Sequence, residues 1–195
     1  MSDQASFKGE NFVHQKISGT DFTNLDLKFS SFSYCQFFSC NFSQAKFNST
    51  LFRHCQFIDC CFSGVDFSDI NLKTCSFSNT LINLATFQQI KNSLGHDLIK
   101  FDLNKIKFEN CDLSESLFDF CSLEKSEFLN CNLSQTNFKK CDLSQADLSG
   151  SQIIGTIFIE STIHQTKIDL NSLIQFGQTN GFILNSNCGS NFLPL

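Results

Sequence analysis

The chain has 195 residues, which suits one domain of ordinary size, and its 14 basic and 19 acidic residues give a net charge of -5. This negative balance argues against direct binding to nucleic acid or to an anionic membrane surface. No stretch approaches about 18 consecutive apolar residues and the first residues do not resemble a signal peptide, so we expect no membrane span and a cytoplasmic location.

The composition is strongly biased, with 25 Phe, 11 Cys, one Pro and no Trp. So many cysteines would indicate a disulfide scaffold in a short secreted chain. The odd count and the missing signal favour reduced thiols instead. A bias of this kind calls for a search for internal repeats.

From Phe7 to Phe87 an apolar residue occupies every fifth position, and most of these residues are Phe. A period of five fits neither the helical period of about 3.6 nor the strand period of about 2. The chain must therefore turn once in every five residues, and four such corners would make a square coil that stacks on the next. The centres of this first ladder are Phe7, Phe12, Ile17, Phe22, Leu27, Phe32, Phe37, Phe42, Phe47, Phe52, Phe57, Phe62, Phe67, Leu72, Phe77, Ile82 and Phe87.

The positions beside each centre support a stacked coil. Two residues before the centre the side chain is usually small, as at Cys55 and Thr80, and would point inward beside the large central residue. Two residues after the centre is where a corner could require positive φ, which glycine adopts easily. The glycines at that position are Gly9, Gly19, Gly64, Gly150 and Gly155. We therefore expect an all-β quadrilateral β-helix whose coils hydrogen-bond about 4.8 Å apart.

The ladder is interrupted at about residues 88–100, and the register slips by one residue between Phe87 and Leu98. One interpretation is a bulge between two stacked halves. The other is an extruded loop that touches a partner, since loops on rigid scaffolds often carry binding. The residues that would make those contacts are Gln89, Lys91, Asn92 and His96.

The repeat resumes and again places an apolar residue at every fifth position, so we expect the β-helix to span residues 1–169. As in the first half, all of its centres are apolar and small residues precede most of them. The centres of the second ladder are Leu103, Phe108, Leu113, Phe118, Leu123, Phe128, Leu133, Phe138, Leu143, Leu148, Ile153, Phe158, Ile163 and Ile168.

After Ile168 the repeat stops, and Asp169 or Asn171 could cap a short helix that continues to about Gln178. Gly181 would end the helix, and an apolar strand over 182–184 would follow. We expect residues 185–195 to form a flexible tail.

An exposed solenoid end resembles a sheet edge and has to be covered. A stripe of Leu170, Leu173 and Ile174 could cover it, and the remaining apolar surface of residues 170–184 predicts a homodimer joined through the C-terminal ends. The residues expected in this dimer interface are Leu170, Leu173, Ile174, Phe176, Phe182, Ile183 and Leu184.

Nine of the 11 cysteines occupy the small inward position, and several of them, such as Cys35, Cys55 and Cys75, recur at equivalent places in successive coils, so they should stack. A metal site is one interpretation, and core filling by a small, soft side chain is the other. A linear stack does not offer tetrahedral ligation, so we expect core filling, without metal or cofactor. No phosphate loop, nucleophile elbow or paired-carboxylate motif occurs, and we expect no enzymatic activity.

Acidic residues gather on two adjacent faces of the second half, where Lys105, Lys107 and Lys125 interrupt them. A solvated face is one interpretation. The other is a negative stripe that is presented to a DNA-binding surface of a partner. The residues of this acidic stripe are Glu109, Glu124, Glu127, Asp142 and Asp147.

The repeat resembles the pentapeptide-repeat family, whose motif is roughly a small residue, Asp or Asn, Leu or Phe, and two variable residues. The resemblance covers about residues 5–170 and implies a right-handed quadrilateral β-helix. The best matches to the motif are Thr20-Asp21-Phe22, Val65-Asp66-Phe67, Cys111-Asp112-Leu113, Cys141-Asp142-Leu143 and Ala146-Asp147-Leu148.

Within that family the chain is similar to the Qnr-type quinolone-resistance proteins and the related MfpA protein, in size and in the tail from Lys167 to Ile174. This resemblance implies a rod that dimerises through its C-terminal ends. It also implies binding to DNA gyrase or topoisomerase IV by a surface that resembles duplex DNA, with protection from quinolone-like or peptide inhibitors. The alternative is a non-enzymatic scaffold for another protein.

Overall fold

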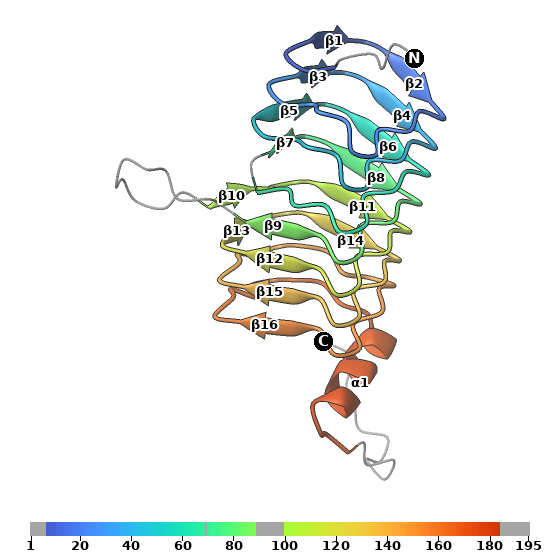
Figure 1. The fold of residues 1–195 in the computed structure, drawn as a ribbon. Helices are drawn as coiled ribbons and strands as arrows, with labels where there is room; N and C mark the ends of the chain where they lie inside the picture. Colours follow the sequence, from blue (N-terminus) through green and yellow to red (C-terminus); the bar gives the residue numbers. More distant parts are fainter. Residues whose placement is uncertain (1–6, 69, 89–99, 184–195) are drawn as a thin grey trace.

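The protein is a rod of stacked coils with one helix at its C-terminal end (Figure 1). The computed structural model describes residues 7–68, 70–88 and 100–183. The all-β solenoid with a short C-terminal helix is confirmed. The described strands are β1 (Asn11–Val13), β2 (Lys16–Ser18), β3 (Ser31–Ser33), β4 (Gln36–Phe38), β5 (Thr50–Arg53), β6 (Gln56–Ile58), β7 (Ile70–Lys73), β8 (Ser76–Ser78), β9 (Thr86–Gln88), β10 (Phe101–Asp102), β11 (Lys107–Glu109), β12 (Leu117–Asp119), β13 (Cys121–Ser122), β14 (Glu127–Leu129), β15 (Asn137–Lys139) and β16 (Ile157–Ile159).

All described strand pairs are parallel, and their register gives the length of one coil. Phe12 pairs with Phe32 and Phe32 with Phe52, so each coil consists of four repeats. One side of the rod has the order β1-β3-β5-β7 and the next β2-β4-β6-β8-β11-β14. A third has the order β9-β12-β15-β16. The fourth side is a column of single bridges, among them Asn41 with Cys61.

The corners explain why one repeat suffices for each side. The residue two after a centre lies in the left-handed region, with φ of +74° at Gly9 and +67° at Gly64. This confirms the expected role of the glycines. Other residue types take the same conformation, including Phe29 at +62° and Leu84 at +58°. The repeated coil thus imposes a conformation that costs an L-residue roughly 1–2 kcal/mol.

One corner carries a short aromatic column. The ring of Tyr34 stacks between those of His14 and His54, with centroid distances of 5.1 and 4.8 Å. These three residues are at equivalent corners of successive coils, so the column follows directly from the register of the coils.

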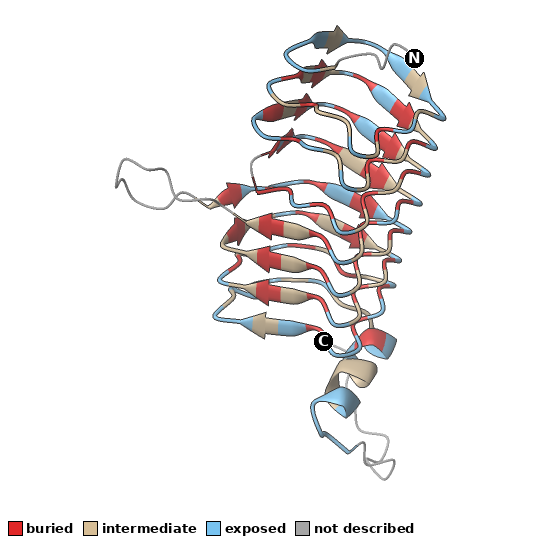
Figure 2. Cartoon of the chain, in the orientation of Figure 1, coloured by how far each residue is buried: buried red, intermediate tan, exposed pale blue. Residues whose placement is uncertain are grey.

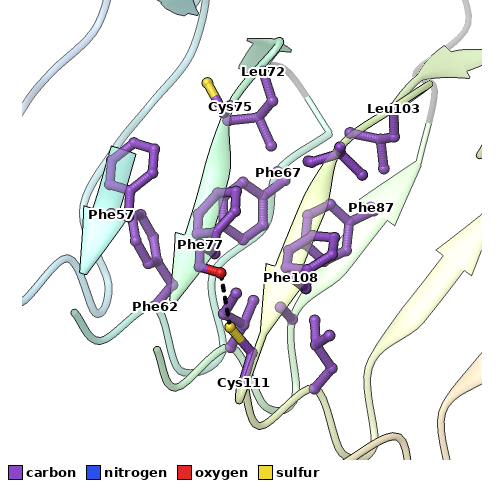
Figure 3. Close-up of a cluster of buried hydrophobic side chains, with 14 of the residues drawn as sticks. Phe57, Phe62, Phe67, Leu72, Cys75, Phe77, Phe87, Leu103, Phe108 and Cys111 are labelled. Carbon is purple, nitrogen blue, oxygen red and sulfur yellow. Dashed lines mark hydrogen bonds between the residues drawn. The ribbon is translucent and has the colours of Figure 1, made fainter. Parts of the chain in front are cut away.

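The core is a set of aromatic columns along the rod axis. Phe57 is fully buried and stacks between Phe37 at 5.0 Å and Phe77 at 4.8 Å. It also meets the edge of Phe62 at 5.2 Å, so rings stack along a column and meet edge to face between columns. Figure 3 shows this arrangement near the middle of the rod, and Figure 2 shows buried centres alternating with exposed corners.

The small inward residues also form hydrogen bonds. The thiol of Cys55 donates to the carbonyl of Phe32 at 3.3 Å, and the hydroxyl of Thr136 donates to that of Leu113 at 2.8 Å. Cys, Ser and Thr therefore have the same two roles at this position. Each side chain fills the core, and each donates a hydrogen bond to a carbonyl of the preceding coil.

The interruption adds residues without disturbing most of the stack. Phe77 pairs with Phe108 and Phe87 with Phe118, whereas a regular coil pairs Phe57 with Phe77. The coil that contains the interruption is therefore 31 residues long, 11 more than a regular coil of 20. This agrees with the expected one-residue slip of register, and such an insertion is too long for a simple bulge. Residues 89–99 lie outside the described residues.

Phe57→Ala should lower the free energy of unfolding by about 3–5 kcal/mol, because it removes a buried ring from a closed column. Phe38→Ser should cost about 1 kcal/mol or less, because Phe38 is only half-buried and stands on the outer face beside Ile58. Chemical denaturation of both variants measures the difference. Equal losses of stability would contradict the assignment of inward and outward positions.

Candidate partner-binding surfaces

The acidic stripe lies on two adjacent sides of the second half of the rod. Glu109 ends β11 and Glu127 begins β14, and a bridge places Asp147 beside Glu127. Another bridge places Asp142 beside Ser122 of β13. Glu109 is exposed, and the other four members, which include Glu124, are half-buried.

Lysines neutralise part of this stripe. The column Lys107, Glu127, Asp147 and Lys167 has an ion pair at each end, at 2.8 Å between Lys107 and Glu127 and 3.4 Å between Lys167 and Asp147. Lys125 Nζ lies 2.5 Å from Glu124 Oε1. Pairs this exposed contribute between 0 and about 1 kcal/mol to stability. Their larger effect is to reduce the negative potential of the surface.

Two of the carboxylates also have a structural role. Asp142 accepts the backbone N–H of Ser144 and Asp147 that of Ser149, each at 3.0 Å. The side-chain and backbone donors of Ser144 lower the pKa of Asp142. Partial burial opposes ionisation of Asp147, but the donors of Ser149 and the nearby Lys167 leave its pKa lowered.

The same hydrogen bond recurs elsewhere along the rod. The backbone N–H of Ser68 donates to the carboxylate of Asp66, and that of Ser114 donates to the carboxylate of Asp112. An acid one residue before a centre therefore fixes the following corner, as in other Asx turns. Sequence reasoning identified the acids but missed this role. The signal was present in the spacing of Asp or Asn two residues before Ser or Thr.

The residues proposed to contact a partner from the interruption are Gln89, Lys91, Asn92 and His96, and all four lie outside the described residues. Leu184 of the expected dimer interface also lies outside them.

The C-terminal end of the rod exposes much apolar surface. Ile163 is a ladder centre, yet 56% of it is exposed because no further coil covers it. Exposed apolar side chains also occur on the last coils and on the tail. They are Ile154, Ile157, Ile159, Leu170, Leu173, Phe182 and Ile183.

Asp169 caps the helix α1 (Leu170–Thr179), which extends one residue past the expected end at Gln178. The face of the helix that packs on the rod differs from the expected one. Ser172 is its buried residue, and Phe176 contacts Phe158 edge to face at 5.9 Å. The expectation that Leu170 and Leu173 cover the end was wrong, because a polar contact orients the helix. Ile174 is half-buried, and the described residues 182–183 form no strand.

That polar contact centres on Asp169. Its carboxylate accepts the N–H of Ser172 at 3.0 Å, the hydroxyl of Ser172 at 2.7 Å and the N–H of Gly150 at 2.8 Å. The Ser172 hydroxyl also lies 2.7 Å from the carbonyl oxygen of Ser151, so its single proton is shared between these two acceptors. These donors lower the pKa of Asp169 to about 2. One carboxylate thus both caps the helix and ties it to the last coil.

The cysteine column behaves as part of the core. Burial raises the pKa of Cys75 and Cys121, which keeps these thiols protonated. Within the described residues no group of three or more His, Cys, Asp or Glu side chains is placed to hold a metal ion. Nor is any helix described there long and apolar enough to cross a membrane.

Comparison with known proteins identifies the repeat. A family model described as a pentapeptide repeat region matches residues 101–176, and one described as pentapeptide repeats matches residues 5–44 and 35–73. Together they cover more than half of the chain. None of the curated proteins matches it significantly.

Solved structures with a similar path include full-length QnrB1, a plasmid-mediated fluoroquinolone resistance protein, at 20% identity and a TM-score of 0.43 over 93% of this chain and 94% of that one. A trypsin-treated QnrB1 variant has 19% identity and a TM-score of 0.44, covering 94% and 96%. HetL from the cyanobacterium Nostoc, involved in heterocyst differentiation regulation, has 15% identity and a TM-score of 0.31, covering 84% and 90%. At these values the structures carry no argument about function.

Attachment of the helix should depend on pH through Asp169. Because its pKa falls from 3.8 to about 2 on folding, its contribution is present above pH 3.8 and is lost as the pH falls toward 2. Asp169→Ala should remove the attachment at neutral pH and speed amide exchange of α1 about fivefold. Hydrogen exchange of residues 170–179 measures both effects.

Asp169→Asn is the matched control, since its amide oxygen still accepts a hydrogen bond but does not titrate in this range. Its helix should have protection factors, which are exchange rates corrected for the intrinsic pH dependence of amide exchange, that do not change between pH 4 and pH 2, a range set by the ordinary and lowered pKa of Asp169. The same acid-induced fraying in this variant would show that another group controls the attachment.

Proposed function

This chain belongs to the pentapeptide-repeat family, and we propose that it is a non-enzymatic rod that binds a type II topoisomerase. The partner would be DNA gyrase or topoisomerase IV, and binding would protect that enzyme from quinolone-like or peptide inhibitors. The proposal combines the resemblance of the sequence to Qnr-type proteins with the surface of the rod.

The observation that carries the proposal is the placement of carboxylates in columns on a rigid rod of net charge -5. A column presents one side chain per coil, about 4.8 Å apart. Duplex DNA presents one charge per about 1.7 Å of its axis. The rod is therefore a sparser charge array than DNA, and it would compete for a DNA-binding groove by shape and sign together.

A scaffold for another protein is the second candidate, and one observation favours it. Glu124, Glu127 and Asp147 each have a lysine within ion-pair distance, so only Glu109 and Asp142 of the acidic stripe lack a pair among the described residues. A rod whose stripe is largely neutral would select a partner by contacts other than charge.

We further propose that the C-terminal end joins two copies of the chain. Eight of the thirteen large apolar side chains that are exposed among the described residues lie at the C-terminal end of the rod, which is unfavourable for a monomer in water. A twofold contact would bury the same patch on both copies. Such a dimer would be a rod twice as long with its acidic sides extending in both directions.

Changing Glu127→Gln, Asp142→Asn and Asp147→Asn together should slow association with purified gyrase about tenfold at low salt, because steering by charge is lost. Melting should change little, since the amide oxygens still accept the Ser144 and Ser149 N–H bonds. Surface plasmon resonance at several salt concentrations measures the rate. A gyrase supercoiling assay with a fluoroquinolone measures the protection.

The matched control is Asp21→Asn with Asp59→Asn and Asp66→Asn, which removes the same charge from the first half of the rod. This variant should associate with gyrase as the native protein does. An equal loss in both variants would assign the effect to net charge alone. Unaltered association of the first variant would remove the DNA-mimic proposal and leave the scaffold.

Leu173→Asp with Ile183→Asp should convert the proposed dimer to a monomer, because each places a charge in the apolar end. Light scattering measures the mass, and circular dichroism should retain the β-helix signal. Phe29→Asp with Leu84→Asp is the control: both are exposed corner residues far from that end, with φ values that Asp tolerates. A native protein that is monomeric at micromolar concentration would contradict the dimer.

A further inference from the structure

On one side of the rod the hydrogen-bonded sheet is interrupted, whereas on the other sides the pairing of the coils continues. The sheet of β1, β3, β5 and β7 ends at β7, and β10 on the same side pairs only with β13. At the same level β8 pairs with β11 and β9 with β12. Figure 1 shows β7 and β10 on the same side of the rod, and these two strands do not pair with each other. We call this break the seam.

The seam leaves backbone groups without the partners that the rest of the rod provides. Elsewhere the N–H of a centre donates to the next coil, as from Phe42 to Cys61 at 2.7 Å and from Ile82 to Asp112 at 2.7 Å. The same pattern would join the Leu72 N–H to the Asp102 carbonyl. Together with a bond from the Asp102 N–H to the Ile70 carbonyl it would form a bridge between β7 and β10, and no such bridge exists among the described residues.

A further bond is missing where β7 ends. The Thr74 N–H would donate to the Asn104 carbonyl, but this bond is absent among the described residues. At the next corner the bond from the Lys107 N–H to the Cys75 carbonyl is stretched to 3.5 Å. β7 and β10 are therefore two facing strand edges, and edges of this kind pair readily with another chain.

Side-chain size accounts for the seam. Ile70 and Phe101 occupy the inward position that Cys, Ser or Thr fills in most coils, and both are buried. Their paired neighbours on the adjoining coils are the small Thr50 and Cys121. Two large side chains in consecutive coils need more room than the coil spacing allows, so they hold β7 and β10 apart.

The seam opens into a groove of about 590 Å³ lined by both edges, and a second hollow of about 420 Å³ continues it around the corner. Four lysines line the two hollows, namely Lys73, Lys100, Lys105 and Lys125, against two carboxylates, Asp102 and Glu124. Lys125 pairs with Glu124, whereas the other three lysines have no ion pair among the described residues. The groove is thus a positive site on an acidic protein.

We infer that the seam binds an extended, acidic peptide segment of a partner protein, which adds a strand to the edge of β7 or β10. The open N–H and C=O groups would pair with the peptide backbone, which is the usual basis of strand addition. The lysines at the rim would pair with its carboxylates. The seam borders the acidic stripe, because Glu124 lines the second hollow. The inference rests on the two strand edges and the lysines, so it does not depend on the proposed topoisomerase function.

The test uses the native protein and a fluorescein-labelled peptide of alternating Glu and Val, with binding followed by fluorescence anisotropy. Two matched probes separate the contributions: the same peptide with Gln in place of Glu, and one with alternate backbone amides N-methylated. We expect the acidic peptide to bind and each of the two altered peptides to bind about tenfold more weakly or worse. Hydrogen exchange should slow at Leu72 and Thr74 when the acidic peptide is bound.

Lys73→Glu with Lys105→Glu should weaken binding of the acidic peptide at least about tenfold. Both residues are exposed, and a melting curve confirms that the variant is folded. Lys16→Glu, an exposed change on another side of the rod, should leave binding unchanged. Absence of binding by the native protein, equal binding of the N-methylated peptide, or equal binding of the Gln peptide would each overturn the inference.

Discussion

The whole structure depends on hydrogen bonds between one coil and the next. Each coil has its amides directed alternately to the coil before and the coil after it, so no coil is complete alone. This constraint requires left-handed corners, which in turn fix which residues point inward. Phe fills the centres because a flat ring can stack on its equivalent in the next coil and meet its neighbours edge to face. The core is therefore continuous along the rod and has no separate centre.

The repeat alone was enough to predict the coil and the inward and outward positions, and the residues after Ile168 were enough to predict a helix capped by Asp169 or Asn171. These features follow from the spacing of residues close together in the chain, which can be read from the sequence. The orientation of the helix did not follow, because apolar residues alone suggested the face of Leu170 and Leu173. The buried hydrogen bond from Ser172 to the last coil decides it instead. A single polar contact of this kind has no periodic signal.

The candidate surfaces were less predictable for a related reason. The positions of the acids could be read from the repeat, but their neighbours on the adjoining coils decide what they do. Glu127 lies between Lys107 and Asp147 only because three coils align them, and the pairing reduces its field. The seam was missed entirely. Its signal was present in the bulk of Ile70 and Phe101 at positions that elsewhere carry small residues.

The aromatic column at the corner of Tyr34 also makes part of this rod visible by optical methods. The chain has one Tyr and no Trp, so its fluorescence above the weak emission of Phe comes from a single site. That site is stacked between His14 and His54, within the first coils. In a solenoid held by nearest neighbours the ends can open before the middle. Tyrosine emission would therefore record the opening of the N-terminal coils alone, while circular dichroism records the whole rod. A difference between the two signals would measure how far cooperativity extends along the stack.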